Sequence, residues 1–142
     1  MDDKIIRDIV ADLDLGMKCF IHVETKEIKV IPDTNKYYGA DLELWSDVIE
    51  EIDNNLDKYY EIGRMHSSES FRLMKDFIDI VDNEFLKEKL INALNRPKPF
   101  KNFNLTIDNS GKYREMWFKF KDQQLAEWVE FQLKQKGLYW LC

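Results

Sequence analysis

One stretch of this sequence combines the side chains that bind nucleic acids with those that bind acidic proteins. Between Arg96 and Lys121 it holds seven basic residues and two acidic ones, in a chain whose formal net charge is −6. Aromatic rings stack on bases, while Lys and Arg hold phosphates or carboxylates. The stretch therefore predicts a binding surface. Its candidate binding residues are Arg96, Lys98, Lys101, Arg114, Trp117, Lys119 and Lys121.

The spacing of the aromatic residues in this stretch supports a second interpretation. Tyr113, Trp117 and Phe120 recur every three or four positions, which places their rings on one face of a helix. A stripe of this kind usually packs into a core while the charges between its members face solvent. We favour core over surface for these rings, and the sequence by itself leaves the choice open.

An acidic segment lies earlier in the chain. From Asp41 to Glu61 there are eight acidic residues and a single lysine. Apolar residues recur there at helical spacing, so we expect an amphipathic helix that begins at Asp41 and carries its carboxylates outward. The separation of charge into a basic and an acidic block favours a non-enzymatic interaction or regulatory module. Such a module would bind another protein or a second copy of itself.

A nucleic-acid-associated regulator is the first alternative, and it would use the stretch 96–121. The pI near 5.0 does not favour this alternative, because binding through counterion release needs clustered Lys and Arg.

A small hydrolase with a carboxylate and histidine site is the second alternative. His66 stands next to Ser67 and Ser68, the residue types of a base and a nucleophile. Serines just before an apolar helical pattern are more often helix caps, and the Gly-x-Ser-x-Gly elbow is absent from the sequence. Asp47, Glu50 and Glu51 lie close on one helical face, but the chain has no zinc or calcium motif, so we expect neither a metal nor a cofactor.

Cysteine usage and hydropathy predict where the chain works. Cys19 and Cys142 lie far apart in the sequence, which is typical of a reducing compartment rather than of a disulfide framework. The first residues lack the features of a signal peptide, and no apolar run approaches the ~18 residues of a membrane span. We therefore expect a cytoplasmic protein without a membrane contact. Cys19 shares its phase with Ile21, so we expect its thiol to be buried and unreactive.

The remaining pattern predicts the elements that position these residues. A first helix runs to about Asp14, and two segments of period-two alternation, up to Glu24 and from Ile28 to Pro32, form a β-hairpin. Residues 59–62 allow a third short strand. Helical spacing recurs in the segments 67–81, 85–94, 99–107 and 113–136. We predict one globular domain, residues 1–142, of the α+β class, mostly helical, with the hairpin packed against five to six helices.

Several short motifs resemble those of a known family. They are Ser67-Ser-Glu-Ser-Phe71, Lys98-Pro-Phe-Lys-Asn-Phe103 and Trp117-Phe-Lys-Phe120. The Glu-Thr-Lys-Glu hairpin turn and Tyr59-Tyr-Glu-Ile62 precede them in the same order as in that family. The chain thus resembles, over nearly its whole length, the bacterial uncharacterised protein family 0158. It departs from the family pattern at Gly63, where prolines are usual, and in the apolar tail after Gly137. The resemblance implies a small cytoplasmic bacterial protein. It implies no activity, because the family has no established function and no catalytic residues to carry over.

Overall fold

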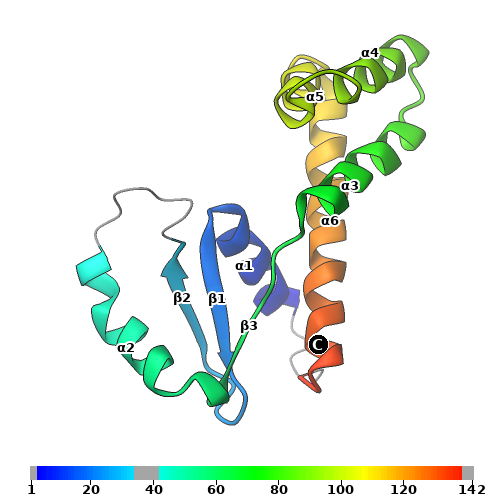
Figure 1. Ribbon diagram of the computed structural model, residues 1–142. Coiled ribbons are helices and arrows are strands. Elements are labelled where there is room, and N and C mark those ends of the chain that lie inside the picture. Colours follow the sequence, from blue (N-terminus) through cyan, green and yellow to red (C-terminus); the bar gives the residue numbers. More distant parts are fainter. Residues whose placement is uncertain (1–2, 34–41, 139–142) are drawn as a thin grey trace. The chain divides into compact units, whose positions relative to one another are not determined.

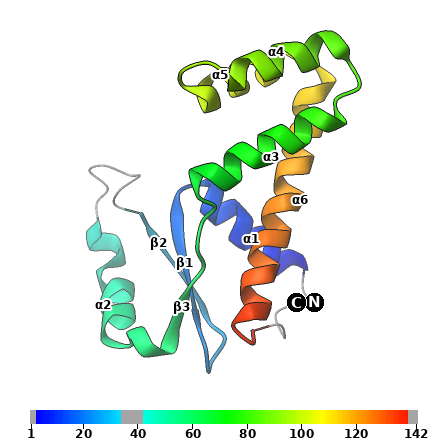
Figure 2. The ribbon, with the colours of Figure 1, turned by 45° about the vertical axis from the view of Figure 1, so that its right-hand side comes forward.

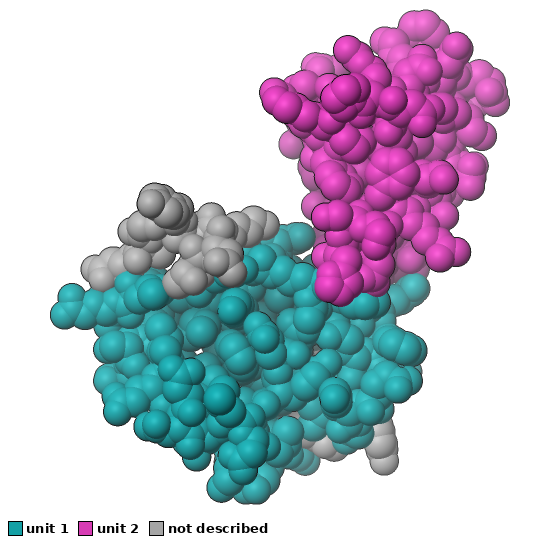
Figure 3. All heavy atoms as spheres, viewed as in Figure 1, with its two compact units in different colours: residues 1–64, 126–142 teal, residues 65–125 magenta. Residues whose placement is uncertain are grey.

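The computed structural model describes residues 3–33 and 42–138 of the chain. The chain divides into two compact units, residues 1–64 with 126–142 and residues 65–125, which Figure 3 colours separately. Within the described residues there are six α-helices and a three-stranded antiparallel sheet, which confirms the α+β class. That residues 1–142 form one domain stays a prediction.

The sheet belongs to the first unit and confirms the expected hairpin and third strand. It consists of β1 (Met17–His22), β2 (Ile28–Pro32) and β3 (Tyr59–Glu61), in the order β2-β1-β3. Both neighbours run antiparallel to β1, and the register pairs Cys19 with Val30 and Ile21 with Tyr60. Because alternate side chains of a strand point to one face, Cys19 and Ile21 are both fully buried.

A histidine shapes the hairpin turn between β1 and β2. The Nδ1 atom of His22 accepts hydrogen bonds from the backbone N–H groups of Glu24 and Thr25, at 3.1 and 3.0 Å. The His22 ring also packs edge-on against Tyr59 of β3, with 5.0 Å between the ring centroids. The side chain thus satisfies turn amides that would otherwise need water.

Two helices of the first unit flank the sheet. Helix α1 (Asp3–Asp14) packs on β1, and Gly16 ends it with a left-handed φ of 85°. Helix α2 (Ser46–Asn54) lies beside β2 (Figures 1 and 2). A 3₁₀ turn, η1 (Leu42–Trp45), precedes α2, and another, η2 (Leu56–Lys58), leads into β3. The α-helix expected from Asp41 therefore begins at Ser46, since the preceding turn is wound more tightly. Asp41 itself lies outside the described residues.

The C-terminal part of helix α6 (Lys112–Gln135) holds the chain where β3 ends. The Gln132 amide accepts a hydrogen bond from the Gly63 N–H at 2.7 Å and donates one to the Gly63 carbonyl at 2.8 Å. The Trp128 indole donates to the same carbonyl, and the Tyr60 hydroxyl donates to Gln132. One glutamine side chain thus satisfies both polar groups of a peptide that leaves the sheet. We call these contacts the Gly63 clamp.

The second unit is helical. It contains α3 (Ser67–Ile80), α4 (Glu84–Leu94), α5 (Pro99–Asp108) and the first part of α6. His66, and not a serine, is the N-cap of α3: Ser67 already lies inside the helix, and the Glu69 carboxylate accepts the His66 N–H at 3.2 Å. Tyr113 of α6 donates a hydrogen bond to the Asp82 carboxylate between α3 and α4. This bond lowers the pKa of Asp82 and raises the pKa of Tyr113.

Candidate interaction surface

Three of the aromatic residues of the stretch 96–121 belong to the core of the second unit, and Phe100, Phe118 and Phe120 pack half-buried against it. Trp117 is 3% exposed and lies 4.9 Å from the Phe103 ring and 5.3 Å from the Phe77 ring, centroid to centroid. Phe103 and Tyr113 are buried as well. The structure therefore places Trp117, a candidate binding residue, where neither a base nor a partner side chain reaches its ring.

The basic residues of the same stretch lie outside this core. Arg96, Lys98, Lys101, Arg114 and Lys119 are exposed, and Lys121 is half-buried. At about 100° per residue, Arg114 and Lys121 lie on nearly the same side of α6, and Lys119 lies about 140° from Arg114. The basic stretch is thus divided over several faces and does not form one surface.

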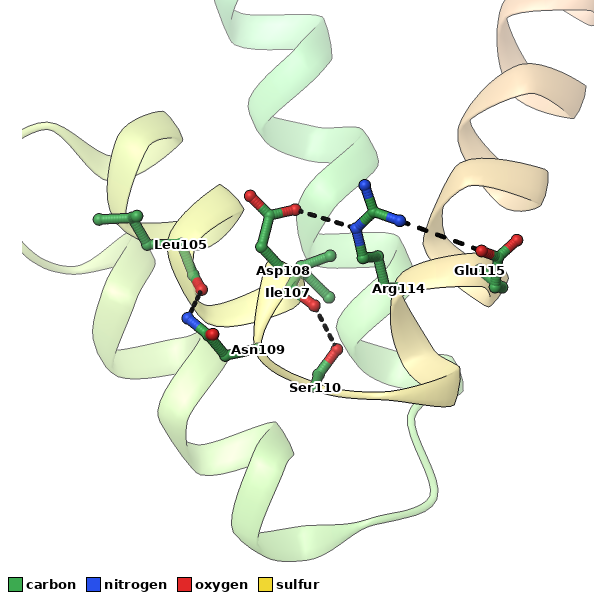
Figure 4. A network of polar contacts seen from close by, with 7 residues as sticks. All are labelled: Leu105, Ile107, Asp108, Asn109, Ser110, Arg114 and Glu115. Carbon is green, nitrogen blue, oxygen red and sulfur yellow. Dashed lines mark hydrogen bonds and ion pairs between the residues drawn. The ribbon is translucent and has the colours of Figure 1, made fainter.

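Arg114 and Lys121 are brought together by Phe118. The Arg114 guanidinium carbon lies 4.8 Å from the centroid of the half-buried Phe118 ring, and the Lys121 Nζ atom lies 5.6 Å from it. Arg114 also contacts two carboxylates, Asp108 at 3.4 Å and Glu115 at 4.0 Å (Figure 4). Figure 4 further shows Asn109 and Ser110 donating to the Leu105 and Ile107 carbonyls at the end of α5. The charge of Arg114 is therefore largely neutralised by carboxylates of the same unit.

Arg96, Lys98 and Lys101 gather where α4 gives way to α5. Lys98 is the N-cap of α5 and adopts a left-handed conformation with a φ of 57°. Among the described residues, none of these three side chains forms an ion pair, so their charges face solvent without a carboxylate partner.

A groove of about 540 Å³ runs between α4 and α5 and ends at Arg96. Its α4 side carries Lys89, Asn92 and Arg96, and its α5 side includes Asn102 and Leu105. The Asn102 amide donates to the Pro97 carbonyl at 2.8 Å, so the α4 side supplies the donors that remain free in the described part. The lining includes two cations and no carboxylate. We call this feature the α4–α5 groove.

The sequence analysis did not single out Lys89 as a member of this site. Lys89 lies on α4, and Arg96 follows two residues after the end of that helix, so helical spacing does not relate the two side chains. Both cations are visible in the sequence, but the pattern of α4 is also that of an ordinary core helix with a solvent-exposed face, so it does not indicate a binding site. Only the position of α5 beside α4 shows that the two cations border a groove.

The acidic segment of the first unit remains exposed in the structure. Glu50 and Asp53 are exposed on α2, as is Asp47, and Ile52 is the buried residue of that helix. Large apolar side chains are exposed next to the carboxylates, Leu44 by 80% of its surface. Asp47, Glu50 and Asp53 make no ion pair with any described residue.

The residues considered for catalysis are not assembled around a hollow. His66, Ser67 and Ser68 are exposed, and no hydrogen bond joins the imidazole to either hydroxyl within the described part of the chain. Neither His66 nor the α2 carboxylates line the α4–α5 groove. No group of three or more His, Cys, Asp or Glu side chains among the residues described is placed to hold a metal ion.

Cys19 is confirmed as a buried residue with a weakly acidic thiol. It has no exposed surface, and burial raises the pKa of its thiol to about 12, with the nearby Asp12 carboxylate adding to the rise and Arg64 opposing it. Because the thiolate is the nucleophile, such a thiol is unreactive in the folded chain. Cys142 lies outside the described residues.

Comparison with known proteins identifies the family. The model of an uncharacterised protein family, UPF0158, matches residues 36–140. The chain belongs to the UPF0158 family. A curated member, UPF0158 protein PA5073 of Pseudomonas aeruginosa, is 27% identical over 78 residues, which cover 55% of this chain and 51% of the relative. The chain thus matches about half the length of that relative.

The family membership confirms the resemblance of the motifs and brings no activity with it. The UPF0158 family has no known function, and its curated member is uncharacterised too. No solved structure matches the chain. No helix within the described residues is both long and apolar enough to cross a membrane.

Proposed function

We propose that this UPF0158 chain is a non-enzymatic interaction module that binds acidic protein surfaces through the cations around α4 and α5. One observation carries the proposal: Phe103, Tyr113 and Trp117 are buried in the core, while Arg96, Lys98 and Lys101 stay exposed and unpaired among the described residues. Surface charges contribute only ~0–1 kcal/mol each to folding, so a concentration of unpaired cations beside a groove points to recognition.

A bacterial cytoplasm is the setting that we infer for this module. Its support is the use of cysteine: Cys19 is a buried free thiol, and a structural disulfide is not expected of the two cysteines in this sequence. The relative from Pseudomonas aeruginosa supports the bacterial assignment.

An acidic probe tests the proposed function. Fluorescence anisotropy would measure the binding of labelled poly-glutamate, about 20 residues long, to the full chain at low ionic strength, where charge pairs are least screened. Replacing Arg96→Glu and Lys101→Glu together should weaken binding about tenfold, which corresponds to ~1.4 kcal/mol. The matched control is Arg72→Glu with Lys75→Glu, two exposed cations of α3, and it should bind like the wild type.

Two results would count against this function. One is the absence of poly-glutamate binding by the wild-type chain at low salt. The other is an equal loss of binding in the control pair, since that result would reflect net charge and not the cations around α4 and α5. Far-UV circular dichroism would show that each variant is folded.

A further inference from the structure

The α4–α5 groove combines apolar and positively charged lining residues. Its volume is about 540 Å³, and its lining combines the apolar Leu86, Ala93 and Leu105 with Lys89 and Arg96. Leu105 is 51% exposed, so apolar surface in the groove remains uncovered within the unit. A ligand that fits must supply carboxylates and apolar side chains together.

One cation of the groove contacts an aromatic ring, and neither cation is neutralised. The Lys89 Nζ atom lies 4.5 Å from the centroid of the Phe85 ring, and Phe85 is itself 70% exposed. Neither Lys89 nor Arg96 forms an ion pair with a described residue. A carboxylate that enters the groove can therefore form an ion pair with either cation without displacing a carboxylate of the described part.

The same chain carries a segment with the matching chemistry. At about 100° per residue, Asp47 and Glu50 lie on one side of α2, and Leu44 of η1 is exposed next to them. Seven positions separate Glu43 from Glu50, and seven also separate Lys89 from Arg96.

We propose that the α4–α5 groove of one copy binds the η1–α2 segment, residues 42–54, of a second copy. Lys89 and Arg96 face the carboxylates of that segment, and Leu44 covers the apolar floor near Leu105. This inference rests on the proposed function and names the partner. Two reciprocal contacts close a symmetric dimer, while contacts in one direction only extend a chain of copies. In both arrangements the average mass of the particles in solution rises with the concentration of the protein.

A charge-swap experiment on the full chain tests the inference. The groove variant is Lys89→Glu with Arg96→Glu, and the segment variant is Asp47→Lys with Glu50→Lys. Sedimentation velocity, from micromolar to millimolar chain, should show association of the wild type and an apparent Kd at least about tenfold weaker for each variant alone. In an equimolar mixture every groove meets a segment of opposite charge, so association should return to within about threefold of the wild type. Arg72→Glu with Lys75→Glu again serves as the control and should associate normally.

The outcomes separate this inference from the proposed function. A wild type that is monomeric at millimolar concentration overturns the inference, and so does a mixture that associates no better than either variant. If poly-glutamate still binds in a manner sensitive to Arg96, the proposed function stands without self-association. If that probe fails too, both are overturned. Should a charge reversal prevent folding, Lys89→Ala with Arg96→Ala is the milder variant, and unchanged association in it also overturns the inference.

Discussion

At the scale of single residues, the structure separates side chains that the sequence places next to each other. Trp117 and Phe118 are neighbours, yet Trp117 is buried against Phe103 and Phe77, while Phe118 lies half-buried under Arg114. A turn of 100° around α6 moves a side chain from the core to its margin. The residue types alone suggest one aromatic and basic surface, and the helix divides them between packing and solvent.

The core position of Trp117 predicts a large loss of stability on truncation. Trp117→Ala should lower the free energy of unfolding by about 3–5 kcal/mol, because it removes a buried indole from contact with two rings. Urea denaturation followed by far-UV circular dichroism measures the loss. The control is Phe85→Ala at a side chain that is 70% exposed, which should cost less than about 1 kcal/mol. Equal effects of the two substitutions would show that Trp117 is not a core residue.

At the scale of elements, the Gly63 clamp shows how α6 holds a segment that lies far from it in sequence. Gln132 both donates to and accepts from the Gly63 peptide, so the orientation of its amide is set by the backbone. A Cβ atom added at Gly63 would lie 3.2 Å from the Gln132 Oε1 atom, which is a tight contact. This chain therefore uses a glycine together with Gln132 at that point.

The clamp predicts a pH-dependent variant. In Gln132→Glu the ionised carboxylate accepts the Gly63 N–H but cannot donate to the Gly63 carbonyl, so at pH 7 the variant should lose about 1 kcal/mol. The protonated carboxyl can donate, so the fold favours its neutral form and raises its pKa above the unfolded value of about 4.3. The stability from the neutral form is present below that value and is lost as the pH rises through the folded pKa. The deficit against the wild type should therefore shrink between about pH 7 and pH 4.

Urea unfolding of the wild type and the variant at both pH values measures this change. Gln132→Ala is the control, because it cannot titrate and its deficit should not depend on pH in the same way. A deficit of Gln132→Glu that stays constant or grows as the pH falls would contradict the geometry of the clamp.

At the scale of the whole molecule, helix α6 belongs to both compact units. It runs without interruption from Lys112 to Gln135, whereas the second unit ends at Leu125. Val129 and Leu133 of this helix are fully buried in the first unit, and Trp117 is buried in the second. Because the propagation of a helix is cooperative, the loss of one half removes support from the other half. We therefore retain the prediction that residues 1–142 unfold as a single domain.

The buried thiol of Cys19 reports on the first unit and tests this prediction. In a Cys142→Ser background, Cys19 should react with a thiol reagent only after unfolding, since its thiol is inaccessible and has a pKa near 12. Trp117→Ala, which lies in the second unit, should shift the urea midpoint of Cys19 labelling as far as it shifts the midpoint from circular dichroism. Labelling that keeps its wild-type midpoint would show two independently folding domains.

Most of the secondary structure of this chain could be predicted from local pattern. Period-two alternation identified the hairpin, helical periodicity identified α3 to α6, and Tyr59–Glu61 is the suggested third strand. The start of α2 at Ser46 and the N-cap at His66 were missed. Such boundaries depend on the backbone geometry of one or two turns at the end of a helix. Residue types do not distinguish a 3₁₀ turn from an α-helical turn there.

The candidate site was predicted only in part, for a physical reason. The sequence by itself determined the class of the fold and the separation of charge into an acidic and a basic block, because composition and periodicity are local properties of the chain. Its short motifs indicated the family by resemblance. Helical spacing favoured a core position for Trp117, and only the tertiary structure decided it. It likewise placed Lys89 and Arg96 beside α5 to border a groove. Spacing within a segment indicates which face is buried, whereas the neighbours of that face arise from the packing of distant segments.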